Sequence, residues 1–172
     1  PVSLGTFRDV VYGHTNPGTL ALGLKWKTLN VLEISNPENE NETLFRSNEF
    51  GFNTTVLGDN GRITITKMQY RFGDHSFSME KKDVTQNKYE LKHDGATFRF
   101  IREPGRVWDL PAPVKCYGFP DQVKAYYQNA GFLADLQLQF ESLFNAVYYL
   151  GPLREYPKRQ YSWAGSEPAD MG

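Results

Sequence analysis

The chain has 172 residues, of which 40% are hydrophobic and 15% aromatic, and its formal net charge is −1. This length and composition suit one globular domain with a sizeable core and exclude a disordered chain. The small net charge excludes an overall field that would attract nucleic acid. The single cysteine, Cys116, excludes an internal disulfide framework and a cysteine-based zinc site. No apolar run approaches the ~20 residues of a membrane span.

The first part of the chain predicts a short helix or loop and then two strands. Residues 4–12 suit the helix or loop. Alternating apolar side chains predict one strand over residues 19–28 and another over residues 31–35. The acidic, asparagine-rich residues 36–41 are typical of a solvated hairpin tip.

Residues 43–102 predict an antiparallel meander, because alternating segments are separated by strong turn signals. The turn signals are Gly58-Asp59-Asn60-Gly61, Gly73-Asp74 and Asp94-Gly95, and the last is the preferred pair of a type I′ turn. The strands predicted around these turns are 53–57, 62–69, 76–80, 89–93 and 96–102.

Aromatic and cationic residues alternate at Tyr70-Arg71-Phe72 and over residues 98–102. They could form a stacking platform for single-stranded nucleic acid. An alternating strand, however, points neighbouring side chains to opposite faces. We therefore favour a buried aromatic row with a solvated arginine row.

The histidines do not indicate a metal site. His14, His75 and His93 are scattered, and none belongs to a His-Glu-x-x-His or Cys-His cluster. We expect His75 and His93, which lie near predicted turns, to be solvated. The sequence also lacks a Gly-x-Ser-x-Gly nucleophile elbow. It predicts no catalytic residue and no metal ligand in this chain.

Residues 103–113 contain the predicted boundary, because Pro104-Gly105 and Pro111-Ala112-Pro113 cannot continue a central strand. We divide the chain into a β-rich region, 1–113, and a region of helices, one strand and a basic aromatic loop, 114–172. Together they form one domain or an internal piece of a larger protein.

The second region begins with helical spacing of apolar residues. We expect Asp121 to cap a helix that Gly131 interrupts. A further helical stripe should pack on the meander, because each offers one apolar face that needs a partner. The stripe is Leu136, Phe140, Leu143, Phe144 and Val147.

Residues 147–150 form a short apolar run that predicts a buried strand, which Gly151-Pro152 ends. The predicted fold class is therefore α+β: a mostly antiparallel sheet, then helices, then one buried strand. A loop of cations and aromatics follows the strand, and such a loop suits contact with a phosphate or a partner. The candidate contact residues are Arg154, Lys158, Arg159 and Tyr161. The alternative is a solvated loop.

A wider pattern at both ends of the chain resembles a known family. It consists of Val2 to His14 (VSLGTFRDVVYGH), Phe119-Pro120-Asp121 with Tyr126-Tyr127, and Tyr149-Leu150-Gly151-Pro152-Leu153-Arg154 followed by Pro157, Arg159, Tyr161, Trp163-Ala164-Gly165, Pro168, Asp170 and Gly172. This pattern resembles the middle of a family of prokaryotic AAA-labelled ATPases, which are similar to the ATP-binding-cassette ATPases of the RecF, SMC and OLD kind.

The resemblance implies that the parent protein couples ATP binding and hydrolysis to a conformational change, as a cytoplasmic homodimer of ATPase heads. It implies ATP and Mg²⁺ for the parent, and nucleic acid or a nuclease as a partner in nucleic-acid maintenance or phage defence. No membrane association is implied.

Three family segments are missing from this chain. It has no Gly-x-x-x-x-Gly-Lys-Ser/Thr phosphate loop, no strand ending in an Asp-Glu pair, and no Ser-Gly-Gly-type signature. We therefore expect an internal fragment, trimmed at its start, that binds no cofactor and is inactive by itself. The alternative is a non-enzymatic β-rich binding module for protein or nucleic acid.

Overall fold

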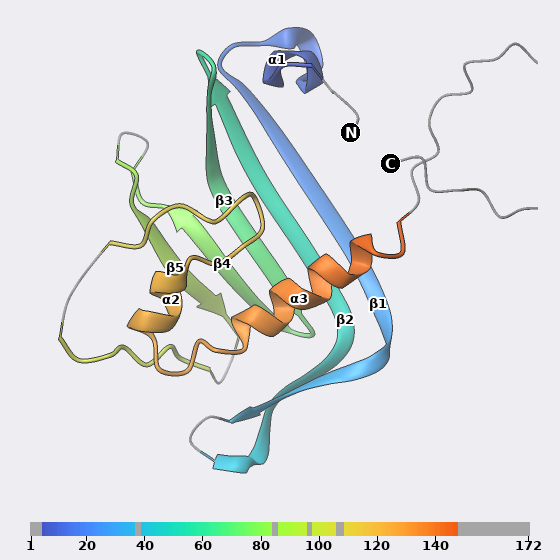
Figure 1. Ribbon diagram of the computed structural model, residues 1–172, viewed down its shortest axis with the longest axis vertical. Coiled ribbons are helices and arrows are strands. Elements are labelled where there is room, and N and C mark those ends of the chain that lie inside the picture. The colour runs from blue at the N-terminus through green and yellow to red at the C-terminus, as the bar shows by residue number, and fades with distance from the viewer. Residues whose placement is uncertain (1–4, 37–38, 84–85, 96–97, 106–108, 148–172) are drawn as a thin grey trace, which may run out of the picture.

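The computed structural model describes residues 5–36, 39–83, 86–95, 98–105 and 109–147. They form an α+β fold, mostly β, in which a five-stranded antiparallel sheet is followed by helices (Figure 1). The elements are α1 (Phe7–Val10), the 3₁₀ helix η1 (Tyr12–His14), β1 (Gly18–Asn36), β2 (Asn39–Asp59), β3 (Arg62–Phe72), β4 (His75–Lys81), β5 (Tyr89–Asp94), α2 (Asp121–Tyr126) and α3 (Leu133–Phe144).

The sheet is a meander in which each strand pairs with the next in the chain. It begins at Gly18, so the predicted start at residue 43 is wrong. The two strands predicted over residues 19–28 and 31–35 are one strand, β1, which pairs with β2. Their predicted separation corresponds to an irregularity between Lys27 and Leu32, where extra residues of β1 bulge out of register with β2.

The turns of the central hairpins are as predicted. Asn60 and Gly61 join β2 to β3 with φ angles of 47° and 80°. Gly73 joins β3 to β4 with a φ of 56°. Asparagine and glycine adopt such positive φ angles at the lowest cost, so these residues fix where the strands end.

The predicted hairpin at Asp94-Gly95 is wrong. β5 ends at Asp94, and the next described residues form no strand. Their backbone is bound instead by the buried Asn129 side chain. Its Oδ1 accepts a hydrogen bond from the Ile101 N–H at 2.9 Å, and its Nδ2 donates to the Arg99 carbonyl oxygen at 2.9 Å. This segment therefore leaves the sheet and lies against the residues that follow α2.

One face of the sheet is apolar and the other is exposed to solvent, as expected of an antiparallel sheet with one covered side. On β3, Met68, Tyr70 and Phe72 are buried, whereas Lys67 before them and Arg71 between Tyr70 and Phe72 are exposed. The apolar face carries α3, which crosses it diagonally (Figure 1). The alternation of side chains along the strands thus defines where the helices pack.

The predicted packing of the helical stripe on the meander is confirmed for its centre. Leu136 and Phe140 are buried in the main core. The Phe140 ring lies 4.3 Å from the Phe52 ring, measured between centroids. The prediction is wrong for Phe144, which is half exposed at the end of α3. Gly131 lies between α2 and α3, which confirms the predicted interruption.

The other predictions for the second region have mixed outcomes. The predicted cap is displaced by one residue, since Pro120 holds the N-cap position and Asp121 begins α2. Of the predicted strand over residues 147–150, only Val147 is described, and its side chain is 58% exposed.

One hydrophobic cluster contains residues of both predicted regions, Phe77 and Leu136 among them. Among the described helices, none has the length and apolar character needed to cross a membrane.

Candidate functional site

The four predicted contact residues, Arg154, Lys158, Arg159 and Tyr161, lie outside the described residues. Two recesses in the described part of the chain differ clearly in chemistry. One is a polar pocket beside β5 and α2, and the other is an apolar groove between α3 and the strands β1 and β2.

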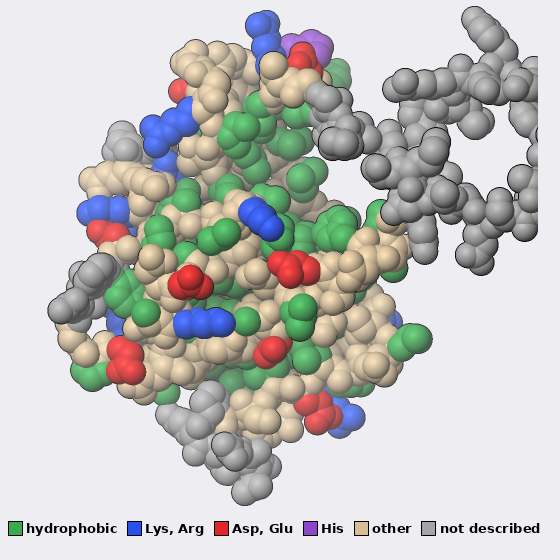
Figure 2. Space-filling view, in the orientation of Figure 1, with side chains coloured by type: hydrophobic (Ala, Val, Ile, Leu, Met, Phe, Trp, Pro, Cys, Tyr) green, Lys and Arg blue, Asp and Glu red, His purple; other side chains and the backbone are tan. Residues whose placement is uncertain are grey.

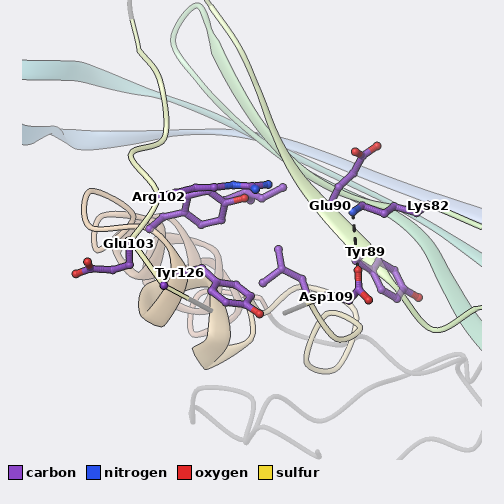
Figure 3. Close-up of a pocket in the computed structure, with 11 residues that line it drawn as sticks. Lys82, Tyr89, Glu90, Arg102, Glu103, Asp109 and Tyr126 are labelled. Atoms are coloured by element: carbon purple, nitrogen blue, oxygen red, sulfur yellow. Dashed lines mark ion pairs between the residues drawn. The ribbon is translucent and has the colours of Figure 1, made fainter. Parts of the chain in front are cut away.

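The polar pocket encloses about 230 Å³ between the sheet edge and α2. Figure 3 shows Lys82, Tyr89 and Glu90 on the sheet side and Arg102, Glu103 and Tyr126 on the opposite side. The side chains that give it its charge are Lys82, Glu90, Arg102, Glu103 and Asp109.

Backbone hydrogen bonds between segments distant in sequence hold the walls of the polar pocket. The Tyr89 N–H donates to the Leu110 carbonyl oxygen at 3.0 Å, which fixes the segment after residue 108 along the edge of β5. The Glu103 N–H donates to the Tyr126 carbonyl oxygen at 2.8 Å. The pocket is thus assembled from three separate stretches, and no local motif could predict it.

Asp109 is held between two lysines. Its carboxylate lies 2.8 Å from Lys88 Nζ and 4.0 Å from Lys82 Nζ. The hydrogen bond from Lys88, together with the charges of both lysines, lowers the pKa of Asp109. A carboxylate held in its charged form in this way is a poor general base at neutral pH, so the pocket suits binding better than acid–base chemistry.

The Tyr126 hydroxyl is the one hydroxyl among the described side chains that is buried without a hydrogen-bond partner. Desolvation by its surroundings and the nearby Asp109 carboxylate raise the pKa of Tyr126. The hydroxyl therefore stays protonated and can donate. Cations and carboxylates both line the polar pocket, and Lys88 pairs with Asp109 beside it, so the pocket suits a polar group of a protein that offers donors and acceptors together.

The apolar groove encloses about 470 Å³ beside the C-terminal half of α3. Leu22 is 50% exposed and Leu24 is 41% exposed, and both lie on β1. Figure 2 shows hydrophobic side chains gathered on this face, over β1 and β2 and next to α3. The lining residues are Leu22, Leu24, Phe52, Thr54, Cys116, Tyr117, Phe140, Glu141 and Phe144.

The histidines pair with each other, so the expectation that His75 and His93 are solvated is wrong. His75 Nδ1 and His93 Nε2 are 3.1 Å apart, and both rings are partly buried beside Phe77. Burial and the neighbouring His75 lower the pKa of His93. Among the described residues, no group of three or more His, Cys, Asp or Glu side chains could hold a metal ion.

The aromatic residues of the proposed stacking platform belong to the core. Tyr70, Phe72 and Phe98 are buried, whereas Arg71 and Arg99 are exposed. Because a base can stack only on an accessible ring, these buried rings offer no stacking platform for single-stranded nucleic acid.

Comparison of the chain with protein-family models, with curated proteins and with solved structures gave no match.

The sequence has no phosphate loop, and the described carboxylates do not gather into a metal site.

Proposed function

We propose that this chain is an internal segment of an ATPase of the ATP-binding-cassette kind, in which the sheet and its helices form a β-rich lobe. The parent couples ATP binding and hydrolysis to a conformational change and acts in the cytoplasm, in nucleic-acid maintenance or phage defence. The observation that carries this proposal is the Tyr149-Leu150-Gly151-Pro152-Leu153-Arg154 motif with Arg159 and Tyr161 behind it.

The resemblance at both ends of the chain supports an internal position. The segment from Val2 to His14 resembles the part of the family that follows its first nucleotide-binding strand and helix. ATP and Mg²⁺ would then be bound by segments of the parent outside this chain. In this proposal the parent is a homodimer of heads, with nucleic acid or a nuclease as partner.

Within the parent, Arg154 and Arg159 are the residues of this chain that we propose to contact a phosphate or a partner. The guanidinium group is planar and can bind two oxygens of a phosphate or carboxylate at once. Tyr161 lies close to them in sequence, and Lys158 adds a further cation.

The test is to make Arg154→Ala and Arg159→Ala in the full-length parent and to measure ATP hydrolysis, DNA binding and melting temperature together. We expect activity to fall with little change in melting temperature. Wild-type activity in both variants would refute the proposed role, and a large loss of melting temperature would show that the arginines hold structure instead. Lys124→Ala, on the exposed side of α2, is a matched control for removing a cation.

A second candidate function is a non-enzymatic binding module for protein, which the polar pocket favours. The unpartnered Tyr126 hydroxyl and the Arg102 guanidinium face a pocket that also carries acceptors. Such a mixed set suits a peptide, which offers donors and acceptors together. In a pull-down experiment, a partner that binds the wild-type chain and binds both Tyr126→Phe and Arg102→Ala more weakly would support this function. A partner that binds both variants as well as the wild type would exclude the polar pocket as its binding site.

A further inference from the structure

The apolar face of the sheet is only partly covered. α3 crosses its lower part and α1 lies at its upper end, and the described helices leave the stretch of β1 and β2 between them uncovered (Figure 1). Leu20, Leu22 and Leu24 occupy alternate positions along this stretch of β1, so they share one face. Their partners on β2 are, in the same order, Val56, Thr54 and Phe52. Together the two rows form a mainly apolar floor.

Two recesses lie end to end on this floor. The apolar groove lies above Leu22 and Leu24, beside α3. A second recess of about 620 Å³, the basic recess, lies nearer to α1, and its lining includes Phe7, Leu20, Val56, Arg62, Ile63 and Lys115. Cys116 lines both recesses, so they adjoin and form one trough along β1 and β2. Figure 2 shows hydrophobic side chains along this face between α1 and α3.

Aromatic side chains close the two ends of the trough. At the end toward α1, the Phe7 ring lies against Gly58, where a larger side chain would collide with it. At the other end, Phe140 and Phe144 of α3 line the apolar groove, with their ring centroids 5.0 Å apart. The floor on β2 runs from Gly58 to Phe52 and is about 20 Å long at about 3.3 Å per residue. The trough therefore suits a long, narrow ligand.

The charge of the basic recess has one sign. Among the described residues that line it, Arg62 and Lys115 are the charged ones, and neither belongs to an ion pair of the described chain. Both are exposed, and the Lys115 ammonium donates a hydrogen bond to the Tyr117 hydroxyl at 3.2 Å. Glu141 lines the apolar groove and not the basic recess. Two unbalanced cations beside an apolar floor are complementary to a ligand with an anionic head and an apolar chain.

We propose that the trough binds one molecule of a linear fatty acid, with its carboxylate between Arg62 and Lys115 and its chain on the floor toward Phe144. The guanidinium group can hold both oxygens of a carboxylate. The chain would cover Leu22 and Leu24, which are 50% and 41% exposed. A contiguous apolar surface with a polar rim is typical of a binding groove. This inference does not rest on the proposed ATPase.

Titration calorimetry of the full chain with decanoate, dodecanoate and decanol, each below the concentration at which it forms micelles, tests the inference. Dodecanoate should saturate one site and bind at least about threefold more tightly than decanoate, because each buried CH₂ adds affinity. Decanol has no anionic head and should bind about tenfold more weakly than decanoate. No saturable binding of dodecanoate, or equal binding of decanoate and decanol, would overturn the proposal.

Substitution of the cations tests the position of the carboxylate. Arg62→Gln and Lys115→Gln should each weaken decanoate binding about threefold and leave decanol binding unchanged. Lys124→Gln is the matched control, because Lys124 is an exposed cation of α2 that lines neither recess. Unchanged decanoate binding in both Arg62→Gln and Lys115→Gln would refute this position, as would an equal loss in Lys124→Gln.

Substitution of the floor tests the position of the chain. Leu22→Asp should abolish dodecanoate binding, whereas Leu29→Asp, at a fully exposed position of β1 outside the trough, should leave it unchanged. Bound dodecanoate should also slow the reaction of Cys116 with a maleimide, because Cys116 lines both recesses. Equal effects of the two leucine substitutions would contradict a role for the floor.

Co-sedimentation with vesicles of phosphatidylcholine and phosphatidylserine distinguishes a single fatty acid from a membrane surface. We expect the chain to bind monomeric dodecanoate and to remain in the supernatant. Sedimentation with the vesicles, without binding of monomeric dodecanoate, would overturn the proposal in favour of a membrane surface.

Discussion

The packing of α3 on the sheet makes a quantitative prediction for Phe140→Ala. Phe140 is 5% exposed, and its ring centroid lies 4.3 Å from that of Phe52 and 6.0 Å from that of Tyr70. Truncation of a buried phenylalanine costs about 3–5 kcal/mol from lost burial and from the cavity. Because Phe140 also lines the apolar groove, water can reach part of the space left behind. We therefore expect a loss at the lower end, about 3 kcal/mol.

Urea unfolding of the wild-type and variant chains, followed by circular dichroism, measures this difference. Leu138→Ala is the matched control, since it removes an apolar side chain of the same helix that is exposed, and we expect a change within about 0.5 kcal/mol. A loss below about 1 kcal/mol for Phe140→Ala would place it in the range of surface substitutions. That result would mean that α3 does not pack on this sheet.

Three further predictions concern chemistry and individual polar groups. The purified chain should release no phosphate from ATP above background, and a rate that persists through further purification would contradict this. The folded state holds the pKa of His93 below its unfolded value of about 6.5. The contribution of His93 to the free energy of unfolding should therefore be full above that pH and be lost as the pH drops through the folded pKa. Unfolding measured at several pH values should show this slope, and His93→Gln should reduce it. Tyr126→Phe should leave the free energy of unfolding unchanged or raise it, because the lost hydroxyl has no hydrogen-bond partner. Tyr89→Phe removes a 2.6 Å hydrogen bond to the Ile65 carbonyl oxygen and should cost about 1 kcal/mol in the same assay.

Local signals in the sequence were enough to predict the centre of the fold. The turn at Asn60-Gly61 and the alternation of Met68, Tyr70 and Phe72 depend on backbone preference and on the two-residue period of a strand. Both are properties of neighbouring residues. The packing of Phe140 followed because an apolar helical stripe and an apolar sheet face each need a partner.

Features that depend on distant residues could not be predicted in this way. Asp94-Gly95 carries a strong turn signal, but Asn129 binds the backbone of the segment that follows and draws it away from the sheet. The polar pocket likewise combines residues between Lys82 and Tyr127 that share no motif. The pairing of His75 with His93 follows from the register of β4 and β5, which places His93 opposite Phe77.

The central claim, that this chain is an internal part of an ATPase, is tested most directly by determining the coding sequence on both sides of it. We predict a Gly-x-x-x-x-Gly-Lys-Ser/Thr loop upstream of Pro1, and a strand ending in an Asp-Glu pair with a Ser-Gly-Gly-type signature downstream of Gly172. A complete reading frame that contains this chain and lacks the phosphate loop would contradict the claim.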